Sequence, residues 1–119
     1  MTHYEHDFLL PYDMKNFLSK EDIAVLPRSH RDAVRLAQAL LDHESSTCMD
    51  VIHIGSILDM APNYDLTTMA MLRAVIVLRS SRMIGMSKHY GKLQLISMNP
   101  ALFSAAAWIR DAADQLCVA

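Results

Sequence analysis

The stretch TTMAMLRAVIVL, residues 67–78, contains a single charged side chain, Arg73, and is otherwise apolar from Met69 to Leu78. A helix at the surface of a globular domain normally has a polar face, and this helix would have none. A helix that is apolar on every side lies in the middle of a core or against another chain. A chain of 119 residues has few other helices with which to surround it. We therefore expect a partner chain to cover part of this helix.

The composition indicates one folded domain that comprises residues 1–119. Hydrophobic residues make up 52% and charged residues 20% of the chain, which is typical of a globular protein and not of a disordered one. Arg73 and Arg79 interrupt the longest apolar run, which is too short for a membrane span of roughly 18 residues. The first residues, MTHYEHDFLLPYD, lack the basic start and long apolar run of a secretory signal. We expect a cytoplasmic protein without a membrane partner.

Helix signals recur along the chain. Ser29 can cap a helix over residues 30–43, which has an apolar stripe at helical spacing. A second helix is expected over residues 48–61, before Pro62, although residues 51–55 also fit one face of a strand. Asp65 can cap the apolar helix over residues 66–79. Asn99 followed by proline is a strong start signal for the last helix.

Residues 83–98, between the last two predicted helices, favour a hairpin. Leu93 and Leu95 alternate with polar residues and Gly91 suits a turn, although a broken helix is an alternative. Residues 1–28 contain Pro11 and Pro27 and are expected to form an irregular arm with room for one short helix. The predicted fold class is a mostly α domain of about four to five helices, with a helical core over residues 29–119 and one short β-hairpin.

Charge is segregated along the chain. Residues 1–65 have a net charge of -6 and residues 66–110 a net charge of +6, and the second range contains no acidic side chain. Its basic residues are Arg73, Arg79, Arg82, Lys88, Lys92 and Arg110. Such a distribution suits binding to nucleic acid, binding to an acidic protein, or self-association.

One hypothesis is a winged helix-turn-helix protein that regulates transcription by binding DNA. Three successive helices followed by a hairpin have that order, and residues 66–79 would be the recognition helix. A recognition helix presents polar groups to base edges, however, and this helix offers only Thr67, Thr68 and Arg73 before its last turn. The small polar surface makes DNA binding the alternative hypothesis. The electrostatic or nucleic-acid contacts expected under it are Arg79, Arg82, Lys88 and Lys92.

The preferred hypothesis is a small regulatory protein that binds and inhibits another protein, most of all a transcriptional activator. Exposed apolar side chains on one helix form a patch typical of an association site. The chain has 9 methionines, whose flexible side chains suit surfaces that adapt to a partner. A homodimer through the same helix is also expected. The candidate residues for partner binding or the dimer interface are Met69, Met71, Leu72, Val75 and Leu78.

No residue pattern favours catalysis or a cofactor. His3, His6 and Asp7 are close in sequence but lie at a terminus, where a metal site with rigid ligands is not expected. His53 lies in an apolar segment and suits a hydrogen-bonded core or interface imidazole. The two cysteines lack metal or redox spacing. We expect neither enzyme activity nor a metal ion or cofactor.

The length, the predominantly helical plan and the segment TTMAMLRAVIVL, followed by the basic RSSR at residues 79–82, resemble a bacterial family. This is the family of small anti-activators of LuxR-type quorum-sensing regulators. The resemblance implies a homodimer whose exposed apolar surface captures the ligand-binding domain of a LuxR-type transcription factor and breaks that factor's own dimer. It assigns no functional residue in this chain, because the shared feature is the overall plan.

Overall fold

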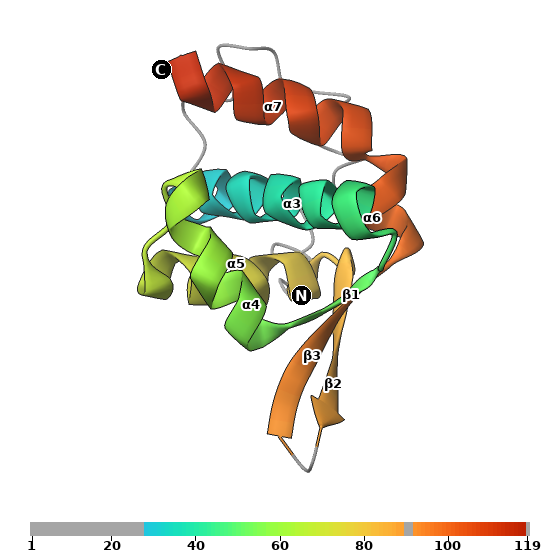
Figure 1. Cartoon of the computed structure of the whole chain (residues 1–119). Coiled ribbons are helices and arrows are strands. Elements are labelled where there is room, and N and C mark those ends of the chain that lie inside the picture. The colour runs from blue at the N-terminus through green and yellow to red at the C-terminus, as the bar shows by residue number, and fades with distance from the viewer. Residues whose placement is uncertain (1–27, 90–91, 119) are drawn as a thin grey trace, which may run out of the picture.

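The computed structural model describes residues 28–89 and 92–118, and the mostly helical fold is as predicted (Figure 1). These residues form five α-helices, one 3-10 helix and a three-stranded antiparallel sheet. The arm predicted over residues 1–28 falls, apart from Arg28, outside the described residues. In chain order the elements are α3 (Arg28–Thr47), β1 (Val51–His53), α4 (Ile54–Met60), η3 (Ala61–Tyr64), α5 (Thr68–Ser80), β2 (Ile84–His89), β3 (Lys92–Met98), α6 (Pro100–Ser104) and α7 (Ala106–Val118).

The sheet has the strand order β1-β3-β2, and both pairings are antiparallel. Strands β2 and β3 form the predicted hairpin, in which Ile84 lies opposite Met98. Strand β1 pairs with the other edge of β3, where the buried Ile52 lies opposite the buried Ile96. The helix predicted over residues 48–61 is therefore wrong for residues 48–53. The alternative of a strand is correct for residues 51–53, where the β-branched Val51 and Ile52 pack well in a sheet. Helix α4 begins only at Ile54.

Helix α3 lies in the middle of the molecule, between α7 and the layer that contains α5 (Figure 1). Its prediction is confirmed, although it extends beyond residues 30–43 at both ends. Leu36 and Leu40 are almost completely buried, as the predicted apolar stripe requires. They belong to one core cluster with Met71 of α5, Ile96 of β3 and Ile109 of α7. Burying one such side chain stabilises the fold by about 1.5–3 kcal/mol.

Two helix ends differ from the predicted caps. Thr67, and not Asp65, caps α5, because its Oγ1 accepts a hydrogen bond from the Ala70 amide at 3.1 Å. Asp65 has a left-handed backbone with φ of 58° and ends η3. Asn99 lies at the start of α6 as predicted, but its side-chain amide donates to the Arg82 carbonyl oxygen at 3.0 Å. Asn99 therefore connects α6 to the turn before β2.

Candidate functional site on helix α5

Helix α5 has a buried face and an exposed face, and this division corrects the predicted interface. Met71, Val75 and Leu78 are 0%, 5% and 3% exposed, so these three candidate interface residues belong to the domain's own core. They lie in one cluster with residues of α3, the sheet and α7. The domain's own elements therefore cover one side of α5 and leave the other side exposed, so the helix is not surrounded on every side, as the chain length predicts.

The other face of α5 is apolar and exposed. Met69 is 61%, Leu72 38% and Ile76 65% exposed; the first two were predicted as interface residues and Ile76 was missed. Residues three and four positions apart lie on the same side of a helix, and Ile76 follows the exposed Arg73 by three positions. The spacing of Ile76 from Arg73 was therefore the sequence signal that Ile76 lies on the exposed side of the helix. We define the α5 face as the exposed residues Thr68, Met69, Leu72, Arg73, Ile76 and Arg79.

His53 is the N-cap of α4 and connects this helix to the sheet. Its Nδ1 accepts a hydrogen bond from the Gly55 amide at 3.1 Å, and its Nε2 lies 3.1 Å from Oε1 of Gln94 on β3. Because Nδ1 is an acceptor, the proton of the neutral ring is on Nε2, which donates to Gln94. The predicted hydrogen-bonded imidazole is confirmed, but it is exposed and not in the core. The side chain fixes the direction in which α4 leaves β1.

Basic side chains flank the α5 face. Arg79, Arg82 and Lys88 are exposed, as the prediction of electrostatic contacts requires, and the side chain of Lys92 lies outside the described residues. The two ion pairs among residues 28–89 and 92–118 are elsewhere, one within α3 and one between α3 and α7. Within the described part of the chain, Arg79, Arg82 and Lys88 therefore form no ion pair.

Arg82 occupies the turn between α5 and β2 with a left-handed backbone, at φ of 63°. This conformation costs a residue with a Cβ atom about 1 kcal/mol relative to glycine. The turn is held by the Arg82 amide, which donates to the Arg79 carbonyl oxygen at 3.0 Å, and by the amide of Asn99. A charged, exposed side chain thus stands at a position where glycine would be less strained.

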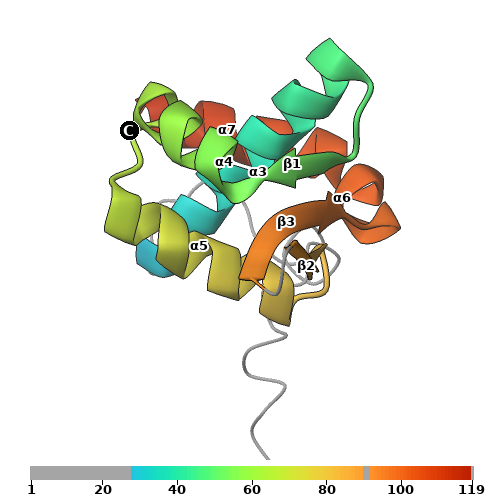
Figure 2. The same cartoon turned by 60° about the horizontal axis from the view of Figure 1, so that its bottom comes forward.

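Along the chain the elements follow the order helix, strand, helix, helix and hairpin, which are α3, β1, α4, α5 and β2–β3. A winged helix-turn-helix domain has its elements in the same order. In that comparison α4 and α5 correspond to the helix pair and the β2–β3 hairpin to the wing. Helix α5 and the hairpin lie on the side of the molecule away from α7 (Figure 1), and Figure 2 shows both from that side. In helix-turn-helix proteins the second helix of the pair enters the major groove of DNA.

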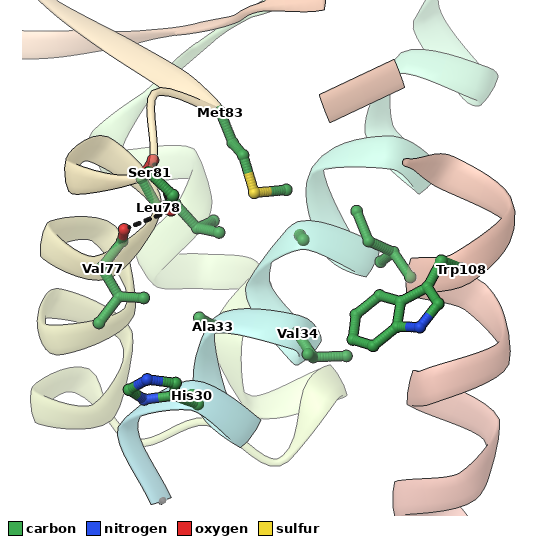
Figure 3. Close-up of a pocket in the computed structure, with 10 residues that line it drawn as sticks. His30, Ala33, Val34, Val77, Leu78, Ser81, Met83 and Trp108 are labelled. Atoms are coloured by element: carbon green, nitrogen blue, oxygen red, sulfur yellow. Dashed lines mark hydrogen bonds between the residues drawn. The ribbon is translucent and has the colours of Figure 1, made fainter. Parts of the chain in front are cut away.

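A small apolar cavity lies between α5, α3 and α7 (Figure 3). It measures about 20 Å³, and its lining includes Val77, Trp108 and His30. Ligand pockets measure roughly 300–1,000 Å³, whereas this cavity has room for about one water molecule. Burial lowers the pKa of His30 below its ordinary value of 6.5. The cavity is therefore a gap in the packing that favours a neutral imidazole, and not a ligand site.

A wider depression of about 320 Å³ is lined by residues of α3, η3 and α7, among them Arg35, Gln38, Asn63 and Tyr64. The Tyr64 hydroxyl donates to Oδ2 of Asp42 at 2.7 Å, and Arg110 donates to Oδ1 of the same carboxylate at 2.8 Å. Burial, followed by the hydrogen bond and the charge of Asp42, raises the pKa of Tyr64 to about 12. The phenol therefore stays protonated and links η3 to α3.

No group of three or more His, Cys, Asp or Glu side chains suited to a metal ion occurs in the described part of the chain. The predicted candidates His3, His6 and Asp7 lie outside it. Within residues 28–89 and 92–118, no helix is long and apolar enough to cross a membrane.

Comparisons with protein-family models, with curated proteins and with solved structures found no match for this chain. The resemblance to anti-activators of LuxR-type regulators therefore stays a prediction.

Proposed function

We propose that the chain is a DNA-binding regulator of the winged helix-turn-helix type, with α5 in the major groove and the β2–β3 hairpin against the sugar-phosphate backbone. The observation that supports this most is the element order combined with the strand order β1-β3-β2. The helix pair α4 and α5 also leaves one face of its second helix exposed, as groove binding requires. On these grounds we prefer DNA binding to protein capture, although the sequence alone favoured protein capture.

The charge distribution supports the same proposal. Contacts between basic side chains and phosphates supply most of the affinity of proteins for DNA, and residues 66–110 contain no acidic side chain. The exposed carboxylates of Asp59 and Asp65 precede α5 and oppose phosphate binding near its first turn. We therefore assign the phosphate contacts to Arg79, Arg82 and Lys88, at the end of α5 and on the hairpin.

A second function, capture of a protein, is supported by one specific observation. Met69, Leu72 and Ile76 are exposed on one side of a single helix, and contiguous exposed apolar side chains are typical of association sites. Under this proposal the α5 face binds a second copy of the chain or a transcriptional activator such as a LuxR-type regulator. Both functions suit a cytoplasmic protein.

Selection from a library of random DNA duplexes, followed by affinity measurements over a salt series, tests the first proposal. We expect enriched duplexes whose affinity falls as salt rises, with a logarithmic slope of about -0.9 for each phosphate contact. Arg79→Gln and Lys88→Gln should each make the slope shallower by about 0.9. Arg79→Lys is the matched control, because it keeps the charge and should keep the slope.

The opposite result would favour the second function. If no duplex binds even at low salt, and Ile76→Asp lowers the sedimentation coefficient of the purified chain, the α5 face joins two copies of the chain. A transcription factor retained from a nuclease-treated lysate by the wild type and not by Ile76→Asp would identify a different protein partner.

A further inference from the structure

The α5 face has few groups that can form hydrogen bonds with bases. In the first two turns the exposed polar side chains are Thr68 and Arg73, while Met69 and Leu72 are apolar. The Oγ1 of Thr67 already accepts the capping hydrogen bond from the Ala70 amide. A helix that recognises base pairs mainly through hydrogen bonds would present more Asn, Gln or Arg side chains here.

We propose that Met69 and Leu72 recognise the 5-methyl groups of thymines, an inference that rests on the proposed function. The preferred duplex would then have thymines at neighbouring positions. The thymine methyl is the apolar group that standard base pairs present in the major groove, and apolar side chains contact it. Met69 and Leu72 are 61% and 38% exposed, so both retain apolar surface that such a contact would bury.

The spacing of the two side chains fits this ligand. Residues three positions apart on a helix have their Cβ atoms about 5–6 Å apart, whereas successive base pairs are about 3.4 Å apart along one strand. Met69 and Leu72 therefore span one to two base steps, and flexible side chains such as Met accommodate the difference. Arg73 is exposed beside them and has the geometry to donate two hydrogen bonds to a guanine.

The surrounding charges favour DNA over a protein as the occupant of the α5 face. Arg73 and Arg79 lie on the same face as the apolar residues, and residues 66–110 supply no carboxylate to neutralise them. In a two-fold interface between copies of this chain both partners would contribute the same arginines and no carboxylate from residues 66–110, so their charges would add to mutual repulsion. A duplex instead supplies phosphates next to the apolar methyl groups.

Uracil-substituted duplexes test the inference. Duplexes enriched from a random library are synthesised twice, with thymine and with deoxyuridine, and fluorescence anisotropy gives the affinity of the wild-type chain for both at one salt concentration. Deoxyuridine differs from thymidine only in lacking the methyl group. We expect the wild-type chain to bind the deoxyuridine duplex more weakly than the thymine duplex, by about fourfold for each of the two methyl contacts. This factor follows from the hydrophobic contribution of one buried carbon. The Met69→Ala/Leu72→Ala double variant should bind both duplexes with equal affinity.

The control is Met49→Ala, which truncates a side chain that is 58% exposed in the loop before β1 and should keep the preference for thymine. Equal wild-type affinity for the two duplexes would overturn the inference and leave the proposed function intact. Absence of any enriched duplex would overturn both. If the double variant folds poorly, the single variants Met69→Ala and Leu72→Ala replace it, and each should lose about half of the preference, expressed as free energy, for thymine. A preference that neither single variant reduces would overturn the assignment to Met69 and Leu72.

Discussion

Val75 and Ile76 are neighbours in the sequence that face opposite sides of α5. Val75 is 5% exposed and belongs to the core, whereas Ile76 is 65% exposed. An unpaired buried carboxylate is very costly, so Val75→Asp should lower the free energy of unfolding by at least about 3 kcal/mol. Ile76→Asp places the same group in water and should change it by less than about 0.5 kcal/mol. Urea unfolding followed by circular dichroism measures both variants.

Equal destabilisation by the two substitutions would contradict the assignment of faces. The sequence alone could not make this distinction, because Val75 and Ile76 are both β-branched and apolar and the helix shows no clear hydrophobic periodicity. The predicted interface role of Met71 and Val75 would make Met71→Asp or Val75→Asp a soluble monomer, whereas the burial of both residues predicts loss of folding. Arg73 was the one residue whose charge indicated the exposed side.

His30 gives a pH dependence with a defined sign. Burial lowers its pKa in the folded chain from the ordinary value of 6.5, so the unfolded state binds a proton more readily. The stabilisation from neutral His30 is complete above about pH 6.5 and is lost as pH falls toward the folded-state pKa. The free energy of unfolding should therefore decrease from about pH 8 to pH 5, and less so in His30→Gln.

Urea titrations of the wild type and His30→Gln at several pH values check this prediction. The difference between the two chains isolates His30 from the other histidines. A difference that is constant with pH would show that His30 has the same pKa in both states. Ser29 is one neighbour of His30, with its Oγ 3.1 Å from Nδ1 of the imidazole.

At the scale of elements, Asp42 of α3 joins η3 and α7 through Tyr64 and Arg110. The Tyr64 hydrogen bond should stabilise the fold by about 1 kcal/mol. The Arg110 and Asp42 side chains are 41% and 38% exposed, so their ion pair should contribute less, at most about 1 kcal/mol. Tyr64→Phe should therefore be more destabilising than Arg110→Gln, and double-mutant cycles with Asp42→Ala measure each coupling.

A spectroscopic measurement distinguishes this link from a loss of packing. Asp42→Asn removes the charge that helps to raise the Tyr64 pKa to about 12, so the phenol should ionise at lower pH in that variant. Absorbance of tyrosinate follows the titration, with Tyr64→Phe identifying its component. An unchanged titration would mean that burial alone sets the pKa.

Elements with local signals were predictable, and those that depend on distant partners were not. The alternation of residues 92–98 and the Asn99 start signal gave the hairpin and the beginning of α6. Strand β1 has three residues and exists through pairing with β3, where Ile52 meets Ile96 far along the chain. The last predicted helix is divided at Ala105 into α6 and α7, for which the sequence showed no breaker.

At the scale of the whole molecule, the segregation of charge was visible in the sequence, but its place on the surface was not. Among the basic residues of the acid-free range 66–110, Arg110 lies on α7 and pairs with Asp42. The others lie on α5, in the turn after it and on the hairpin, which the fold places together on the side away from α7 (Figure 1). The element order gave the winged helix-turn-helix hypothesis from sequence. The pairing of β1 with β3, which distinguishes that arrangement from a plain helical bundle, required the structure.

Arg82 has a strained backbone and is one of the proposed phosphate contacts, so substitutions at this position separate its effect on stability from its effect on DNA binding. Its left-handed backbone, at φ of 63°, costs about 1 kcal/mol relative to glycine. Arg82→Gly should therefore raise the free energy of unfolding by up to about 1 kcal/mol. The same change should weaken binding to all duplexes alike, because phosphate contacts do not depend on sequence, and should make the salt slope shallower by about 0.9.

Arg82→Lys is the control, since it keeps both the charge and the strained backbone and should change neither stability nor the salt slope. Urea unfolding and anisotropy measurements on the three chains separate the two effects. If Arg82→Gly is more stable and binds DNA with the wild-type slope, the charge at this turn has no part in binding. The phosphate contacts would then be limited to the end of α5 and the hairpin, where Arg79 and Lys88 are exposed.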